Sequence, residues 1–128
     1  MKITLKKLEE ELGYKIKRGF TTIGFDTANR TGVCQIKTNS KVAEFDWTFV
    51  EFDSKNEHVY YKNMVLFFEG ALNNQDLAVI ESTFVGQNPM GAISWTSLGA
   101  FGISEAIRTK LPWERIGASS ARAKLKID

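Results

Sequence analysis

The chain has 128 residues, enough for one domain with a single hydrophobic core and too few for two. With 43% hydrophobic and 25% charged residues, the composition is that of a globular protein, which excludes a disordered or fibrous chain. The sequence contains neither a membrane-spanning apolar run nor an apolar leader, so we expect a cytoplasmic protein that does not contact membranes. The single cysteine, Cys34, excludes an internal disulfide and belongs to no zinc-binding motif.

The net charge of +2 conceals an uneven distribution along the chain. Residues 1–20 and 108–128 together carry a net charge of +7, and residues 21–107 carry −5. Basic ends around an acidic centre are compatible with a polyanion bound at the periphery and a carboxylate site in the middle. On charge alone, an equally good interpretation is that lysines solvate the helical ends of the chain.

The first half of the chain predicts one helix and three strands. Apolar residues recur at helical spacing over residues 4–17, which predicts a short amphipathic helix that Gly13 weakens. Mostly apolar runs over residues 22–28 and 33–38 predict two strands of a hairpin. A third strand is expected over residues 42–52, where alternation indicates one buried face formed by Phe45, Trp47 and Phe49.

The second half predicts two helices that alternate with two strands. Apolar spacing indicates a helix over about residues 56–72, and Leu77–Glu81 is typical of a strand buried on both faces. Pro89 can open a helix over about residues 90–110, with Ala100, Ile103 and Ile107 among the residues expected to face inward and glycines that allow a close approach. A last strand is expected over residues 113–118.

The element order is therefore β-β-β-α-β-α-β, preceded by an N-terminal helix. This order is typical of the α/β class, with a mixed five-stranded sheet and helices on both faces. Residues 1–20 are expected to form an amphipathic helical extension, and residues 21–128 the main domain.

Two acidic residues lie at unusual places in this pattern. Asp26 falls within the first apolar strand of the hairpin, and Glu81 ends the strand over residues 77–81. An ionised carboxylate among apolar residues costs several kcal/mol unless it is paired or bound to a metal. If these strands are parallel neighbours, both carboxylates emerge at one edge of the sheet, where they repel each other unless a divalent cation lies between them. Oxygen ligands favour Mg²⁺ or Mn²⁺ over zinc.

Each acid also has an ordinary structural interpretation. Asp26 can cap the turn at Asn29 and Arg30 or pair with Arg30, and Glu81 can be a solvated strand end. The joint placement of both acids favours the metal site over these two separate explanations.

The segment Ile23-Gly-Phe-Asp26-Thr-Ala-Asn-Arg-Thr-Gly32-Val resembles the first strand and turn of the RuvC-type Holliday-junction resolvases, members of the RNase H-like superfamily. The segment Val79-Ile-Glu81-Ser-Thr-Phe84, with Asn88 and the glycines that follow, is similar to the second catalytic segment of that family. A weaker likeness covers Ile116-Gly-Ala-Ser-Ser-Ala-Arg122-Ala-Lys124. The resemblance extends over roughly residues 21–128 and implies an RNase H-like nuclease domain.

The resemblance also implies an activity and a set of roles. It implies Mg²⁺- or Mn²⁺-dependent hydrolysis of phosphodiester bonds at a four-way DNA junction, by a homodimer that acts in recombination, repair or phage DNA processing. Asp26 and Glu81 match the first two metal ligands, and Phe84 matches an aromatic wedge at the branch point, although Phe84 could instead be a core residue. Asn88, together with the basic residues Arg122 and Lys124, is expected to contact DNA.

One departure from the family leaves alternatives open. The remaining acidic ligands of the family lie on a helix after the third segment, and the sequence ends at Asp128, before such a helix. The chain is then either a piece of a longer resolvase or a variant that binds junctions without cutting them well. A third alternative is a YqgF-type ribosomal-RNA processing nuclease, a family that shares the first strand motif but usually lacks a glutamate at the place of Glu81.

Overall fold

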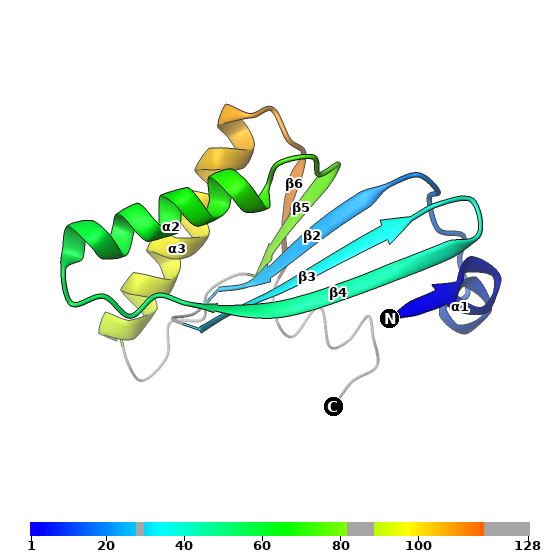
Figure 1. The fold of residues 1–128 in the computed structure, drawn as a ribbon, viewed down its shortest axis with the longest axis horizontal. Coiled ribbons are helices and arrows are strands. Elements are labelled where there is room, and N and C mark those ends of the chain that lie inside the picture. The colour runs from blue at the N-terminus through cyan, green and yellow to red at the C-terminus, as the bar shows by residue number, and fades with distance from the viewer. Residues whose placement is uncertain (28–29, 82–88, 117–128) are drawn as a thin grey trace.

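The structure is a computed structural model that describes residues 1–27, 30–81 and 89–116, with the backbone alone described for residues 89–98. Within these ranges it contains six strands and three helices (Figure 1). In chain order they are β1 (Lys2–Thr4), α1 (Leu5–Leu12), β2 (Thr21–Asp26), β3 (Arg30–Thr38), β4 (Val42–Glu51), α2 (Glu57–Ala71), β5 (Leu77–Glu81), α3 (Pro89–Arg108) and β6 (Trp113–Ile116).

The strands form one mixed sheet in the order β1-β4-β3-β2-β5-β6. β1, β4, β3 and β2 pair antiparallel, whereas β5 is parallel to both β2 and β6. The predicted α/β class and element order are therefore confirmed, and the sheet gains β1 as a sixth strand. β1 was not predicted because three residues are too few to show an alternation, and the strand is fixed by backbone pairing with Val42–Glu44.

The first helix is shorter than the sequence predicts. The Thr4 side chain caps its start by accepting a hydrogen bond from the backbone N–H of Lys7. Gly13 takes a left-handed conformation with a φ of 80°, which ends the helix there instead of at residue 17. Glu9 then holds the following segment against α1, because its carboxylate accepts from the Ile16 N–H and pairs with Arg18 at 3.0 Å.

α2 and α3 pack together over one face of the sheet, at the opposite end of the long strands from α1 (Figure 1). The core lies beneath them, where the rings of Phe25, Phe67 and Phe68 meet edge to face at centroid distances of 5.0–5.8 Å. Gly102 of α3 lies directly against Phe68.

Two of the residues expected to face inward from α3 are exposed. Ala100 is exposed and 61% of the Ile107 side chain is accessible, whereas Ile103 packs against the core as expected. The prediction for Ala100 and Ile107 was wrong because Gly99 and Gly102 face the sheet and bring the helix close to it, which turns those two residues outward.

The other face of the sheet is covered by α1 at one end. Leu8 and Leu12 of α1 line a cleft with the strand residues Thr22, Ile36, Phe45 and Leu77. Helices therefore lie on both faces, as predicted. No helix in the described part of the chain is both long and apolar enough to span a membrane.

Candidate active site

Asp26 and Glu81 are brought together by the parallel pairing of β2 with β5. Phe25 lies opposite Ile80 in this register, so the next residue in each strand, Asp26 and Glu81, stands at the same level at the carboxyl ends of the two strands. Side chains alternate along a strand, and Phe25 and Ile80 are both buried beneath the helices. The two carboxylates therefore emerge on the opposite face of the sheet, as neighbours.

The burial of these carboxylates differs from the sequence prediction. Asp26 is exposed and Glu81 is half-buried. Asp26 does not lie among apolar side chains, because its neighbour on β3 is Gly32 and its neighbour on β5 is Glu81. Water solvates the carboxylate of an exposed aspartate, so the free-energy cost of burying a charge does not apply to Asp26. The case for a cation now rests on the proximity of two like charges, and not on burial.

Arg30 has partners on β4. Its Nε lies 3.8 Å from a carboxylate oxygen of Glu51, and its guanidinium lies 4.4 Å from the centre of the Phe49 ring. Arg30 therefore contacts the neighbouring strand β4, and its ion pair with Glu51 is a weak one because both side chains are well exposed.

The donor set fits a hard cation that keeps part of its hydration shell. Mg²⁺ is commonly held by one or two carboxylates, with water and substrate phosphate completing the octahedron. Asp26 and Glu81 supply two carboxylates of this kind. Among the residues that the structure describes, no group of three or more His, Cys, Asp or Glu side chains could hold a metal.

The predicted DNA contacts lie outside the described residues. Phe84 and Asn88 fall within residues 82–88, and Arg122 and Lys124 fall within residues 117–128. Their roles remain predictions.

Two aromatic residues of β4, Trp47 and Phe49, are exposed although the sequence predicts that they are buried. Trp47 and Phe49 were expected on a buried face, but 63% and 59% of their side chains are accessible. Alternation correctly places both on one face of β4, yet it does not show whether anything covers that face. Phe45 shares a cleft with α1 and the segment that follows it, whereas Trp47 and Phe49 do not line that cleft.

Comparison with known proteins supports the fold. No protein-family model matches the sequence, and neither does any curated protein. Among solved structures, Thermus thermophilus RuvC in complex with a Holliday junction substrate is similar with a TM-score of 0.69 and 10% identity, over 81% of this chain and 68% of that one. A second Thermus thermophilus RuvC structure gives 0.58 and 12%, over 85% and 82%. The yeast mitochondrial Holliday junction resolvase gives 0.60 and 13%, over 93% and 59%. The chain thus has the fold of RuvC-type resolvases, as its sequence motifs predicted.

Proposed function

We propose that this chain is a metal-dependent, structure-specific endonuclease that hydrolyses DNA phosphodiester bonds at four-way junctions. One observation carries the proposal: Asp26 and Glu81 stand side by side at the carboxyl ends of parallel strands, in a fold shared with Holliday junction resolvases. The carboxyl ends of parallel strands are where active sites of open α/β sheets gather.

The chemistry follows from what two adjacent carboxylates can do. Their oxygens would hold Mg²⁺ or Mn²⁺, which would lower the pKa of a bound water and stabilise the charge on the leaving oxygen. Asp26 is exposed, so a metal ion held by its carboxylate could take a phosphate oxygen of DNA as a further ligand. Glu81 is half-buried at the end of β5, a strand paired on both sides, and would approach the same ion from this second strand.

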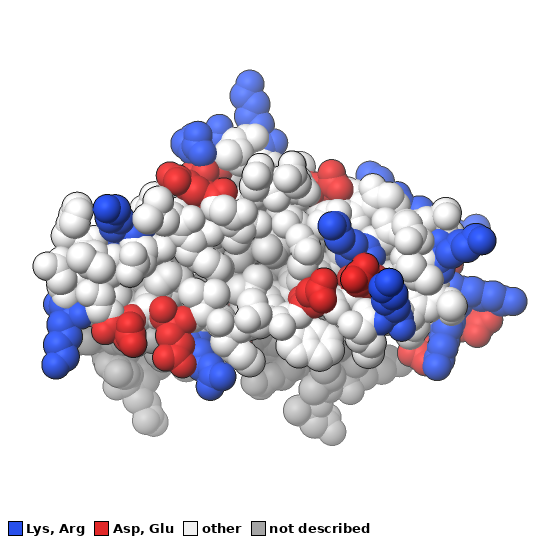
Figure 2. Space-filling model, viewed as in Figure 1, with Lys and Arg blue, Asp and Glu red and all other residues white. Residues whose placement is uncertain are grey.

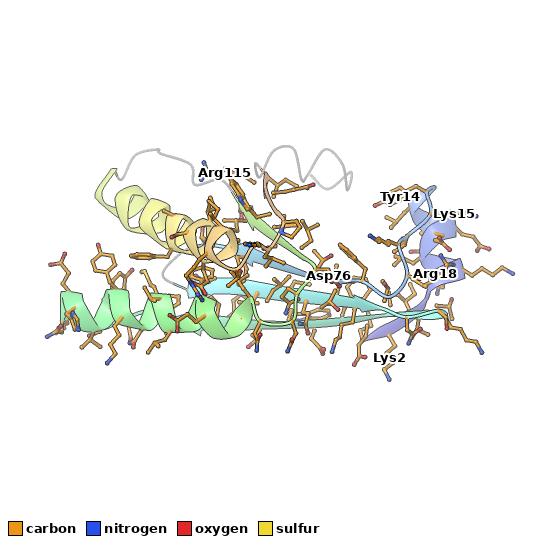
Figure 3. All side chains as sticks on the ribbon, turned by 90° about the horizontal axis from the view of Figure 1, so that it is seen from above. Lys2, Tyr14, Lys15, Arg18, Asp76 and Arg115 are labelled. Carbon is orange, nitrogen blue, oxygen red and sulfur yellow. The ribbon has the colours of Figure 1, made fainter. Side chains whose placement is uncertain are left out.

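Basic residues are placed to hold a polyanion. Several Lys and Arg side chains lie at the end of the molecule that carries α1, interspersed with Asp and Glu side chains (Figure 2). Tyr14, Lys15 and Arg18 lie together beside α1, away from α2 and α3 (Figure 3). Contacts between such residues and phosphates release counterions, so we expect DNA affinity to fall steeply as salt is raised.

We further propose that the active form is a homodimer, because a symmetric junction needs two strands cut by two equivalent sites. An apolar groove between α2 and α3, lined by Tyr61, Val65, Leu66 and Phe101, is a described surface that could take part in such an interface. Sedimentation velocity on the chain, alone and with a four-way junction, tests this: a single monomeric species under both conditions would refute it.

A junction-binding module without efficient cleavage is the second candidate. It is favoured by the described part of the chain, which offers two carboxylates and no third ligand at the site. Such a module would retard a four-way junction in a gel but release no product in either metal.

The decisive experiment incubates the chain with a labelled four-way junction, the matching linear duplex and an RNA junction of the same sequence, in Mg²⁺ and in Mn²⁺. We expect paired nicks near the branch point of the DNA junction, and their loss in Asp26→Asn and Glu81→Gln. Asp53→Asn, which removes an exposed carboxylate from the loop after β4, is the matched control and should cut normally.

Three outcomes would change the assignment. Metal-dependent cutting that persists in Asp26→Asn would remove Asp26 from the site. Binding of the DNA junction without any product would favour the binding module. Preferential cutting of RNA would favour the ribosomal-RNA processing alternative.

A further inference from the structure

Two large aromatic side chains lie exposed on β4, on the face of the sheet that carries the two carboxylates. Trp47 and Phe49 are two residues apart on β4 and so point to the same side of the sheet. The accessible fractions of their side chains, 63% and 59%, are far above those of the core aromatics Phe25 and Phe68, at 3% and 0%. Such side chains exposed together mark a binding surface more often than isolated apolar residues do.

This surface is continuous with the candidate active site. Phe49 pairs with Gly32 across β3, and Gly32 pairs with Asp26 across β2, so the three residues form one row on one face. The position that a Cβ atom would take at Gly32 is 3.6 Å from Asp26 Cβ and 3.6 Å from Phe49 Cε1. The edge of the Phe49 ring is therefore separated from Asp26 Cβ by at most twice that distance.

The sheet surface between the aromatic residues and β5 has a low position, because Gly24 has no side chain. The next row across the sheet runs from Trp47 through Cys34 and Gly24 to Val79. A Cβ atom at Gly24 would meet only backbone oxygens, those of Val79 at 3.8 Å and Cys34 at 3.9 Å. The sheet surface is therefore bare backbone at Gly24, between the side chains of Cys34 and Val79, which leaves a low position in this row for the edge of a flat group.

Positive charge is available at both ends of this surface. Arg30 lies over the Phe49 ring, and its pairing with Glu51 is weak because both side chains are well exposed, at 65% and 62%. Along β2, Thr22 shares a cleft with Lys15 and Lys17. Asp26 is four positions after Thr22, which corresponds to about 13 Å along an extended strand. That span suits about two nucleotides of a single strand between the carboxylates and the lysines.

We propose that this surface, the aromatic face (Arg30, Trp47 and Phe49 with the sheet surface at Gly24 and Gly32), binds unpaired DNA nucleotides that flank the cleaved phosphate. Stacking on aromatic rings is open to every base and is independent of sequence, while Arg30 and the lysines of the Thr22 cleft attract the phosphates. The inference rests on the proposed function, since it assigns the strand next to the scissile bond to the open face of the same site. It predicts that the chain needs unpaired bases beside the cut, in addition to a branched duplex.

The test measures binding without cleavage. Fluorescence anisotropy of a labelled oligo-dT, in EDTA and low salt, gives the affinity of the full chain for unpaired DNA. We expect Trp47→Ala and Phe49→Ala each to weaken it by about 5- to 100-fold. Trp113→Ala, which removes a partly exposed tryptophan from β6 at the edge of the sheet, is the matched control and should bind normally.

Two further variants separate stacking from simple apolar contact. Trp47→Phe should retain most of the affinity, whereas Trp47→Leu should lose about as much as Trp47→Ala, because leucine offers no ring on which a base can stack. Gly24→Val should weaken binding because the valine side chain would fill the low position in the sheet surface. Circular dichroism and thermal melting should show an intact fold, since valine suits a strand and the Cβ atom would make only ordinary contacts of 3.8 and 3.9 Å.

The outcomes distinguish this inference from the proposed function. If Asp26→Asn abolishes junction cutting but the aromatic variants bind oligo-dT and cut junctions like the parent chain, the inference is wrong and the nuclease stands. If oligo-dT binding depends on Trp47 and Phe49 while no junction is cut in either metal, the nuclease is wrong and the aromatic face is a binding site for unpaired DNA. Variants that change a dimer into a monomer without altering oligo-dT affinity would make this face a protein interface, and tighter binding of oligo-rU than oligo-dT would overturn the assignment to DNA.

Discussion

Replacing Gly102 by alanine should destabilise the protein, although alanine is normally the better residue in a helix. Gly102 is buried in α3 at the point where the helix crosses the core. A Cβ atom there would lie 2.8 Å from Phe68 Cε1, 3.1 Å from Phe68 Cζ and 3.2 Å from Ile80 Cδ1. Phe68 is fully buried and Ile80 is 1% exposed, so neither side chain can move away without disturbing its neighbours.

The two contributions to the free energy have opposite signs. Forcing a methyl group into a well-packed core costs about 1–3 kcal/mol, and the higher helix propensity of alanine returns about 1 kcal/mol. We therefore expect a net loss of up to about 2 kcal/mol in the free energy of unfolding. Gly70→Ala is the matched control, because a Cβ atom at Gly70 of α2 meets nothing within 4 Å. It should gain up to about 1 kcal/mol.

Urea unfolding followed by circular dichroism measures both variants under the same conditions. The expected order of unfolding midpoints is Gly70→Ala, the parent chain and then Gly102→Ala, with similar slopes. Gly99→Ala should lie between the two variants, since its Cβ atom would make ordinary contacts of 3.7 and 3.9 Å. A Gly102→Ala midpoint as high as that of Gly70→Ala would refute the close packing of α3 against β5.

Three other changes probe single features of the fold. Asn56→Ala should lower the free energy of unfolding by about 1 kcal/mol, because the Asn56 side chain caps α2 by accepting a hydrogen bond from the Val59 N–H at 3.0 Å. Asn56→Asp should retain most of this stability in thermal melts. Equal melting temperatures for both variants and the parent chain would exclude the cap. Phe68→Ala should cost about 3–5 kcal/mol in urea unfolding, and a loss below that of an exposed Leu66→Ala would contradict its place in the core. The Arg108 guanidinium beside Glu105 lowers the pKa of that carboxyl, so the native state binds fewer protons than the unfolded chain and stability falls as the pH drops below about 5. Glu105→Gln should lose less stability over the same pH range. A loss equal to that of the parent chain would refute the pairing.

Local patterns predicted the elements that are governed by local forces. The helix expected over residues 56–72 is found at Glu57–Ala71, because apolar spacing and the Asn56 cap both act within a few residues. The strand Leu77–Glu81 has the predicted bounds, since an unbroken apolar run followed by an acid is distinctive. Asp26 and Glu81 became neighbours as predicted because parallel pairing aligns strand ends.

The errors concern what covers each face of the sheet. Trp47, Phe49 and Asp26 lie on the face of the sheet that α1 covers at one end, and all three are exposed. Alternation along β4 or β2 contains no information about an element that is distant in the sequence. The strand at Lys2–Thr4 was missed for the same reason, since only its pairing with β4 defines it.

The pairing of β2 with β5 determines when during folding the carboxylates can meet. A hydrogen bond from the Thr21 N–H to the Asp76 carboxylate, at 2.8 Å, ties the start of β2 to the residue before β5 across 55 positions of sequence. The antiparallel meander of β2, β3 and β4 can form first, because its strands are neighbours in the sequence. β5 joins only after a loop containing β3, β4 and α2 has closed. On a ribosome, a nascent chain that has emerged through α2 would therefore present Asp26 and the aromatic face without Glu81. The carboxylate pair would be assembled late in synthesis, when β5 has emerged.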